Sequence, residues 1–449
     1  MTFEPLAEVA ATLGFRGEVI GPTHEDYDAR RRVWNGLFDR HPAVIVRACN
    51  ADDVRRAVDL AAGATVPLAI RGGGHSFPGH STCDDGIVVD LSPMSEVTVN
   101  EDRSMARVGG GALLGDVDSA GKPYGLVVPA GVVSHTGVGG LTLGGGMGWN
   151  SRRYGLTIDN LLKVDMVLAD GSLLTIDEET EPDLFWAIRG GGGNFGVVTS
   201  FEFRMRPLGP AVVVTSVYPT ADAGRVLASY AELVETAPRE LATGFTLSEA
   251  DLRMKAVWYG PADEADSVLG PFQHLGEVVP SETYTSTFWE LQQASDEALP
   301  WGRRYYAKGG FLSSVDSAAV DWLTQCADQA PTPDCDVYVI QLGGAVADVS
   351  DDATAYTGRS ASFYWVVNGV WDTPGGDETC LGWGRNTAEG LSRRSLASNY
   401  INEQSDVTPE VARNAYGPTT YDRLVSLKQR HDPTNLFHLN QNVRPGRST

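Results

Sequence analysis

One histidine, His75, follows three consecutive glycines in the segment 71–76, RGGGHS, directly after the apolar run 66–70. Glycine has no Cβ, so the backbone of such a segment can lie against a flat or anionic ligand and adopt positive φ angles. Its free N–H groups can form a concave binding site for phosphate. Taken alone, a surface turn with an incidental histidine is the better explanation. Two further glycine clusters downstream favour a ligand site.

A second cluster spans residues 129–148, PAGVVSHTGVGGLTLGGGMG, and no helix-forming run separates its glycines. Such a segment gains little stability from its own packing and leaves many backbone N–H groups without partners. A long cofactor with a pyrophosphate would satisfy those groups. A flexible linker fits poorly, because Val138, Leu141 and Leu143 are interspersed here as buried residues would be.

The third cluster, 190–196, contains the spacing G-x-G-x-x-G at Gly191, Gly193 and Gly196. The dinucleotide-binding fingerprint requires a strand before these glycines and a helix after them. Here the order is reversed, because an amphipathic helix is expected before the glycines, over 183–189, and a strand after them. A nicotinamide-binding Rossmann fold is therefore disfavoured. The sequence also contains no G-x-x-x-x-G-K-[ST], which excludes a nucleotide-hydrolysing P-loop.

Short strands and helices are expected to position these loops. The pattern predicts strands at 43–46, 66–70, 87–90 and 197–203. Asn50 is placed to cap a helix whose apolar residues recur at i, i+3, i+4 and i+7. The glycine clusters stop near residues 207–210, where amphipathic helices and aromatic strands take over, which indicates a domain boundary. A last helix is expected over 418–430, ending at Asp432-Pro433.

Composition excludes several classes of protein. A chain of 449 residues is expected to form two or three domains. Its formal net charge of −23 disfavours nucleic acid and anionic membranes as partners and fits a small, uncharged or cationic substrate. The five cysteines form no Cys-x-x-Cys pair, so neither a metal site nor a disulfide scaffold is expected. No secretion signal and no apolar run of about 18 residues is recognised, so a cytoplasmic location is expected.

Five segments together carry a specific resemblance. They are RGGGHS at 71–76, VGGLTLGGGMG at 138–148, YGLTIDNL at 154–161, DLFWAIRGGGGNFGVVTSF at 183–201 and YDRLVSLKQRHDPTNLFHLNQN at 421–442. In this order they resemble the vanillyl-alcohol-oxidase and p-cresol-methylhydroxylase (PCMH) superfamily, and most closely its berberine-bridge-enzyme-like branch. The resemblance implies an α+β fold, with a two-subdomain FAD-binding domain of the PCMH type and an α/β substrate domain with an antiparallel sheet. It places the FAD-binding domain at 1–206, with 400–449 returning to it, and the substrate domain at 207–399.

The resemblance also implies a covalently attached FAD. In the family, the histidine of the RGGGHS motif bonds to the flavin 8α-methyl carbon, and His75 holds that position. Many relatives add a second link from a cysteine, but Val133 stands at the corresponding position, so a single link is expected. The implied cofactor-binding residues are Arg71, Gly72, Gly73, Gly74, His75, Ser76, Gly79, Ala130, Gly131, His135, Thr136, Gly137, Gly139, Gly140, Leu141, Gly144, Gly145, Gly148, Gly196, Val197, Val198, Tyr400, Asn440 and Asn442.

Oxidation of an alcohol or amine also needs a base near the substrate. In the family this base is typically a tyrosine or a carboxylate. Tyr400 belongs to the Tyr-x-Asn segment 400–402, and Tyr364 lies on an expected strand whose even-numbered residues share one face. Either tyrosine is equally a candidate core residue. His135 and Thr136 are expected near the flavin ring, either in contact with its edge or with oxygen, or capping N–H groups of the loop.

The implied function is that of a covalent FAD-dependent oxidase. A small-molecule alcohol, amine or secondary metabolite would transfer hydride to flavin N5, and O2 would reoxidise the flavin and give H2O2. Two alternatives stay open. One is an oxygenating tailoring enzyme. The other is a flavin-binding protein without turnover, which Val133 and Met147 favour because relatives often have a cysteine and a tyrosine at these positions.

Overall fold

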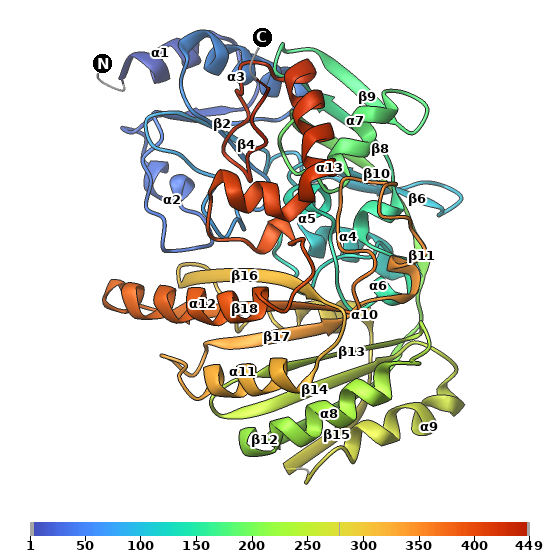
Figure 1. Cartoon of the computed structure of the whole chain (residues 1–449). Coiled ribbons are helices and arrows are strands. Elements are labelled where there is room, and N and C mark those ends of the chain that lie inside the picture. The colour runs from blue at the N-terminus through green and yellow to red at the C-terminus, as the bar shows by residue number, and fades with distance from the viewer. Residues whose placement is uncertain (1–3, 278, 447–449) are drawn as a thin grey trace.

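The computed structural model describes residues 4–277 and 279–446. Figure 1 shows two small sheets with their helices in the upper part of the molecule and one large sheet in the lower part. The C-terminal helix α13 (Pro409–His431) packs back against the upper part. Helices and largely antiparallel sheets together confirm the predicted α+β fold class.

The first small sheet delivers the first glycine loop. Its strands, in spatial order, are β1 (Glu18–Ile20), β2 (Val44–Arg47), β4 (Ile87–Asp90) and β3 (Leu68–Arg71). Strands β2, β4 and β3 are parallel, as expected for strands joined by the crossover helix α3 (Ala51–Ala64). Asn50 caps α3 by accepting a hydrogen bond from the Asp53 N–H, as predicted. The loop that contains His75 begins where β3 ends.

The second small sheet carries the third glycine cluster. Its strands are β5 (Val97–Val99), β6 (Met105–Gly109), β10 (Val197–Arg204), β8 (Leu161–Val167) and β9 (Leu173–Asp177), all antiparallel. Helix α7 (Pro182–Ile188) precedes the glycines and β10 follows them. The reversed order of helix and strand that disfavours a Rossmann fold is therefore confirmed.

The second glycine cluster contains a helix, so the prediction that no helix-forming run separates its glycines is wrong. Residues Val138–Gly144 form a helix, α5. Glycine costs about 1 kcal/mol relative to alanine in a helix, so local propensity opposes this conformation. Tertiary contacts outweigh that cost, because Val138, Thr142 and Leu143 are buried. The Leu143 carbonyl also accepts hydrogen bonds from the N–H groups of Gly190 and Gly192, which joins the second cluster to the third.

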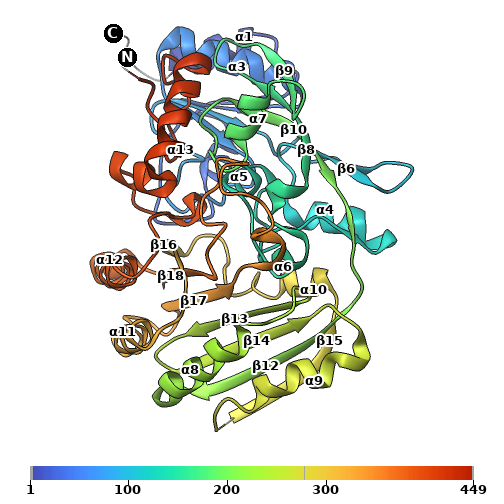
Figure 2. The same ribbon diagram turned by 45° about the vertical axis from the view of Figure 1, so that its right-hand side comes forward.

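The large sheet has seven antiparallel strands. Their spatial order is β15 (Val279–Ser286), β12 (Ala211–Pro219), β14 (Asp251–Trp258), β13 (Leu241–Leu247), β17 (Asp336–Gln341), β18 (Phe363–Trp371) and β16 (Arg304–Leu312). Its outer face packs on α8 (Ala223–Val234), α9 (Ala265–Leu269), α11 (Ser317–Ala327) and α12 (Asp377–Ser392). Figure 2 shows these helices on the side of the sheet that faces away from the glycine loops. The inner face is thereby left free to face those loops.

Shorter elements complete the chain. They are α1 (Glu4–Thr12), α2 (Tyr27–Arg31), α4 (Leu114–Gly121), β7 (Leu126–Val127), α6 (Ser151–Tyr154), β11 (Arg206–Pro207), α10 (Phe288–Gln293) and eight 3-10 turns, η1 (Lys122–Tyr124), η2 (Thr157–Asn160), η3 (Thr220–Asp222), η4 (Ala262–Glu264), η5 (Gly270–Gln273), η6 (Gly344–Val346), η7 (Pro374–Gly376) and η8 (Ile401–Glu403). None of the helices in the described part of the chain is long and apolar enough to cross a membrane.

One buried lysine fastens the C-terminal segment to the third glycine cluster. The Lys428 ammonium donates hydrogen bonds to the carbonyls of Asn194 (2.7 Å) and Phe437 (2.8 Å) and pairs with Asp432 (2.7 Å). Lys428 and Asp432 are fully buried, so each charge depends on the other. These contacts return the chain after α13 to the glycine loops and not to the large sheet. Helix α13 itself contains a kink at Gly417, where φ is 70°.

Candidate active site

A cavity of about 810 Å³ lies between the glycine loops and the inner face of the large sheet. All three glycine clusters contribute to its wall. On the opposite side the cavity is lined by β13, β14, β17 and β18, and by the segment 400–403 that leads back toward α13. Residues far apart in the sequence therefore face one another across this space.

The glycine side of the cavity is shaped by backbone contacts that leave no room for side chains. A Cβ on Gly73 would lie 2.3 Å from the backbone nitrogen of Gly137, so the first two clusters touch backbone to backbone. Gly74 has a φ of 70°, a conformation that favours glycine. By contrast, a Cβ on Gly140 or Gly193 would meet no atom within 4 Å, and both residues line the cavity. The loops thus form a smooth cradle that a flat ligand can approach closely.

Several polar atoms at this cradle have no hydrogen-bond partner among the described residues. They include His80 Nε2, Ser81 Oγ and Asn440 Oδ1, all on residues that line the cavity. A buried polar atom without a partner costs free energy, so these atoms are suited to a bound polar ligand. The donors, acceptors and open glycines together fit a long cofactor that carries both a flat ring and phosphate groups.

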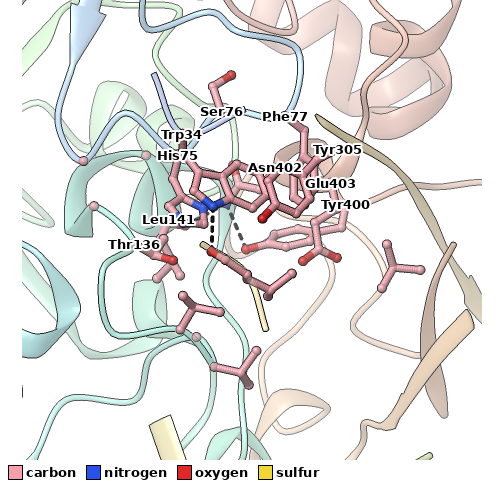
Figure 3. Close-up of a pocket in the computed structure, with 18 of the residues that line it drawn as sticks. Trp34, His75, Ser76, Phe77, Thr136, Leu141, Tyr305, Tyr400, Asn402 and Glu403 are labelled. Atoms are coloured by element: carbon pink, nitrogen blue, oxygen red, sulfur yellow. Dashed lines mark hydrogen bonds between the residues drawn. The ribbon is translucent and has the colours of Figure 1, made fainter. Parts of the chain in front are cut away.

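His75 is held between an aromatic ring and a second histidine. Its ring stacks on Trp34, with centroids 4.1 Å apart, and Trp34 stacks in turn on Tyr305 at 3.8 Å. Its Nε2 lies 2.9 Å from Nδ1 of His135. Burial, together with the neighbouring His135, lowers the pKa of His75 to about 3, so the imidazole is neutral at physiological pH. Figure 3 shows His75 and Trp34 on the same side of the pocket as Thr136.

Tyr400 is fixed by two donors at the edge of the second glycine cluster. Its hydroxyl accepts hydrogen bonds from the Gly146 N–H (3.1 Å) and from Asn402 Nδ2 (2.9 Å). Asn402 Nδ2 also donates to the carbonyl of Leu141 at 3.0 Å (Figure 3). Burial raises the pKa of Tyr400 above its usual value, which keeps the phenol protonated. The phenol can therefore donate its own proton to a bound ligand.

A carboxylic acid, Glu403, lies beside these groups. The hydroxyl of Tyr364 donates a hydrogen bond to Glu403 Oε2. Burial raises the pKa of Glu403 to about 7, although the hydrogen bond from Tyr364 opposes this shift. Gly309 on β16 leaves the space that Tyr364 occupies, because a Cβ there would lie 2.0 Å from the Tyr364 hydroxyl. A carboxyl group whose pKa is close to physiological pH is suited to accept and return a proton.

A second carboxyl group lies further along the inner face of the sheet. Asp336 on β17 accepts a hydrogen bond from Asn368 Nδ2 at 2.8 Å, and the two residues are opposite one another on β17 and β18. Burial raises the pKa of Asp336 to about 7. The side of the cavity opposite the glycine loops thus carries two carboxyl groups whose pKa is raised to about 7, one on the sheet and one on the segment 400–403, whereas the described residues of the glycine wall include none.

Comparison with known proteins agrees with this arrangement. Residues 42–177 match the FAD binding domain family, and residues 399–444 match the berberine and berberine-like family. A FAD-linked oxidoreductase of Dictyostelium discoideum is 30% identical over 96% of this chain and 95% of its own length. The chain belongs to the berberine-bridge-enzyme-like family of FAD-linked oxidoreductases.

Other members of the berberine-bridge-enzyme-like family match along their whole length. The (R)-6-hydroxynicotine oxidase of Paenarthrobacter nicotinovorans is 28% identical, over 98% of this chain and 99% of its own. A crystal structure of 6-hydroxy-D-nicotine oxidase from Arthrobacter nicotinovorans superposes with a TM-score of 0.89 at 25% identity, over 97% of this chain and 100% of that one. Glucooligosaccharide oxidase of Acremonium strictum, with a 6-S-cysteinyl, 8α-N1-histidyl FAD, shares the fold at a TM-score of 0.89, 22% identity and full coverage of both chains.

The structure brings most of the predicted site residues of this family member to the cavity. Those that line it are Gly72, Gly73, Gly74, His75, Ser76, Gly131, Thr136, Gly137, Gly139, Gly140, Leu141, Gly196, Val197, Val198, Tyr364, Tyr400 and Asn440. His135 does not line the cavity itself but contacts His75 through the hydrogen bond between their rings. Val133, at the expected cysteine position, lines the cavity as well.

Several predicted cofactor-binding residues lie outside the cavity lining. They are Arg71, Gly79, Ala130, Gly144, Gly145, Gly148 and Asn442. The Arg71 guanidinium donates to backbone carbonyls, among them that of Ser81 at 3.3 Å. A Cβ on Gly144 would lie 2.2 Å from Asn402 Oδ1, and one on Gly148 would lie 2.1 Å from the Ala130 carbonyl. These glycines allow close packing between segments, and the structure gives them no contact with the cavity.

Sequence reasoning missed several residues of the site. Glu403 directly follows the Tyr-x-Asn segment, so its position next to Tyr400 was the one signal that could have found it. Trp34 and Tyr305 give no local signal, because they meet His75 only through the fold. Asp336 becomes a neighbour of Asn368 only through the pairing of β17 with β18.

Proposed function

We propose that this protein is an oxidase in which His75 carries a covalently attached FAD and Glu403 accepts a proton from a small-molecule alcohol or amine. The observation that carries the proposal is the neutral, partly buried His75 at the edge of a glycine cradle, with a carboxyl group of pKa about 7 across the same cavity. FAD held by the glycine cradle would supply a two-electron acceptor at N5 for hydride from the substrate carbon, and O2 would take up the two electrons as H2O2.

The orientation of His75 supports the covalent link. Its Nε2 is engaged with His135, so Nδ1 is the ring nitrogen left to react. Stacking on Trp34 fixes the plane of the ring. The new bond would join Nδ1 to the 8α carbon and replace one C–H bond of that methyl group. The two electrons and two protons released in this step would be taken up by O2. Val133 bears no sulfur, so a single link is proposed.

The carboxyl group of Glu403 would perform the proton transfer. In its ionised form, Glu403 accepts the proton of the substrate O–H or N–H group, while Tyr364 donates to its other lone pairs. Tyr400, a fixed phenol, would orient the substrate oxygen or nitrogen. Thr136 lines the same cavity and would contact the ring edge or oxygen. The hydrophobic residues around these groups exclude bulk water, which strengthens each polar contact.

The proposal includes the division of the chain and its location. Residues 1–206 and 400–449 would bind FAD, whereas residues 207–399, which contain all seven strands of the large sheet, would bind the substrate. The protein would work in the cytoplasm on a soluble small molecule. The comparisons support the cofactor through the FAD binding domain match.

Denaturation of the purified protein tests the link. We expect a yellow precipitate from the wild type and a mass that exceeds the chain by one FAD, and both should be lost in His75→Ala. His431→Ala is the control, since His431 lies in the last turn of α13 and does not line the cavity, so the bond should stay intact. Flavin colour released into solution from the wild type would contradict the covalent link.

A second measurement tests the reaction. Anaerobic addition of a substrate should bleach the flavin, and one H2O2 should form per substrate when oxygen returns. Incorporation of labelled oxygen into the product would instead show the oxygenating reaction. If no alcohol or amine in a broad panel bleaches the flavin, the protein binds flavin without turnover and the proposed function is wrong.

A further inference from the structure

One basic side chain that lines the cavity, Lys255, has no acidic partner in the described part of the chain. Lys255 lies on β14, is half-buried and lines the cavity. Its ammonium lies 5.2 Å from the centroid of the Trp149 ring. Burial lowers the pKa of Lys255, and no acidic neighbour among the residues that the structure describes offsets this effect. Arg253, two residues away on the same strand, is by contrast paired with Asp251 at 2.9 Å.

A second polar group without a partner among the described residues meets the same Trp149 ring as this lysine. The hydroxyl of Tyr338 is buried and has no hydrogen-bond partner in the described part of the chain. The Tyr338 side chain covers Gly244, as a Cβ on that glycine would lie 3.5 Å from the Tyr338 hydroxyl. Gly244 is the residue directly opposite Lys255 on the neighbouring strand. The Tyr338 ring also meets Trp149, with centroids 6.5 Å apart.

The strand register separates Lys255 from the reacting groups. Lys255, Gly244, Ile340 and Tyr364 form one row across β14, β13, β17 and β18. Adjacent strands are about 4.8 Å apart, so the backbones of Lys255 and Tyr364 are separated by about 14 Å. A ligand group bound by Lys255 would therefore lie at some distance from Glu403, which is hydrogen-bonded to Tyr364.

An unpaired, half-buried cation is costly, and an anion that pairs with it removes that cost. A carboxylate matches the two donors best, because it accepts a charge-assisted hydrogen bond from an ammonium and a second bond from a phenol. The Trp149 ring provides a flat apolar wall beside the ammonium and holds it in place through a cation–π contact.

We propose that Lys255 and Tyr338 form a subsite for a carboxylate of the substrate, so that the oxidised alcohol or amine is an organic acid. This inference rests on the proposed oxidase function and names the class of its substrate. It departs from the expectation, drawn from the net charge of −23, of an uncharged or cationic substrate. Charges on the outer surface are screened over about 8 Å at physiological ionic strength, whereas Lys255 acts within the cavity.

The subsite is tested by comparing how tightly the flavin-loaded protein binds two small aromatic ligands of nearly equal shape but different charge. Benzoate and benzamide have nearly the same size, but only benzoate carries a negative charge. Their dissociation constants are measured from the change in the flavin absorption spectrum, which requires no turnover. We expect the wild type to bind benzoate at least about tenfold more tightly than benzamide, as a charge-assisted contact provides.

Variants then show whether Lys255 and Tyr338 cause the preference for benzoate over benzamide. Lys255→Met should weaken benzoate binding by about tenfold or more and leave benzamide binding nearly unchanged, whereas Lys255→Arg should keep most of the preference. Tyr338→Phe should weaken benzoate binding by a smaller factor, of a few fold. Lys163→Met is the matched control, since it removes the same charge from a partly exposed position on β8 of another sheet, outside the cavity lining. Flavin content and thermal unfolding confirm that each variant is folded.

Two results would overturn the proposal. One is equal binding of benzoate and benzamide by the wild type. The other is unchanged benzoate binding in a folded, flavin-loaded Lys255→Met. Neither depends on oxidation of any substrate, so failure of the subsite is distinguished from failure of the oxidase function. Conversely, a clear preference for benzoate with no flavin reduction by any organic acid would leave the subsite in place and reject the oxidase.

Discussion

The two walls of the cavity are built in opposite ways. The wall formed by the glycine loops takes its residues from three short contiguous segments, and its shape comes from backbone that approaches backbone, as at Gly73 and Gly137. The wall formed by the large sheet takes single side chains from several strands and from the return segment, as Tyr364, Asp336 and Glu403 show. The first wall provides a surface, and the second provides charges and protons.

In the proposed function, this difference would separate recognition of the cofactor from recognition of the substrate. A cradle made of backbone and glycine fits one large, invariant ligand, and every side chain added to it removes space. A sheet face can change one side chain at a time without altering the strands that support it. In the proposed function, FAD would bind against the first wall, and side chains of the large sheet in the second would select the substrate, so each wall can be tested separately.

Removal of the carboxyl group from the sheet wall should have the largest effect. Glu403→Gln keeps the size of the side chain and loses its ability to accept a proton, so kcat/KM should fall by between about 10² and 10⁴. In the wild type, kcat/KM should rise with pH around 7, since burial raises the pKa of Glu403 to about 7 and only the ionised form is a base. The measurement is anaerobic flavin reduction in a stopped-flow instrument from pH 5.5 to 8.5.

The variant should also lose this rise with pH, while flavin content and the covalent link stay unchanged. Glu389→Gln is a suitable control, because Glu389 is an exposed residue of α12. If Glu403→Gln retained the pH dependence of the wild type, another group would be the base.

Adding a single methyl group to the same wall should lower kcat/KM by a smaller factor. In Gly309→Ala, the new Cβ would lie 2.0 Å from the Tyr364 hydroxyl and would push it away from Glu403. Misplacement of this kind should lower kcat/KM at pH 7 by roughly tenfold to a hundredfold. The hydrogen bond from Tyr364 lowers the pKa of Glu403, so its loss should move the rise of kcat/KM to higher pH.

Tyr364→Phe provides the matched comparison, because it removes the hydrogen bond without adding a methyl group. Both variants should shift the pH profile upward, with flavin content equal to that of the wild type. A shift in Gly309→Ala alone would show that the alanine acts on something other than Tyr364.

The sequence predicts most of the glycine wall of the cavity and little of the wall opposite it. Residues 72–76 and 139–141 were found at the cavity because a glycine cluster is a local signal that survives without knowledge of the fold. Lys255 and Tyr338 were not found, because β14 and β17 are brought together only by β13, which lies between them in the sheet. Glu403 was missed for a different reason, since its place directly after the Tyr-x-Asn segment is a weak signal and a single carboxylate there is also typical of a solvated residue.

The fold shows the same limit. The crossover from β2 through α3 was predicted because a cap and an apolar spacing of i, i+3 and i+4 are local. Helix α5 was missed because its glycines oppose helix formation and only its buried neighbours stabilise it. Gly144, Gly145 and Gly148 were assigned to the cofactor from the family resemblance, although a Cβ on each would meet atoms of distant segments.

The smallest predicted effect distinguishes two glycines of the same helix. Gly144→Ala should destabilise the protein by about 1–3 kcal/mol, because its Cβ would lie 2.2 Å from Asn402 Oδ1 and overfill a closed contact. The midpoint of thermal unfolding should fall. Activity should fall with it, since Asn402 also fixes the Tyr400 hydroxyl at 2.9 Å. The measurement is differential scanning fluorimetry of the flavin-loaded protein, followed by anaerobic flavin reduction.

Gly140→Ala, four residues earlier, should behave in the opposite way. Its Cβ would meet no atom within 4 Å, and alanine is favoured over glycine in a helix by about 1 kcal/mol, so the unfolding midpoint should stay equal or rise. Gly140 lines the cavity, so the methyl group should instead lower flavin content or shift the flavin spectrum. A fall in the unfolding midpoint of Gly140→Ala equal to that of Gly144→Ala would remove the distinction between a glycine that faces the cofactor and one that packs against the return segment. Full flavin content with an unchanged spectrum would place Gly140 away from the cofactor, and the glycine wall would then require a different ligand position.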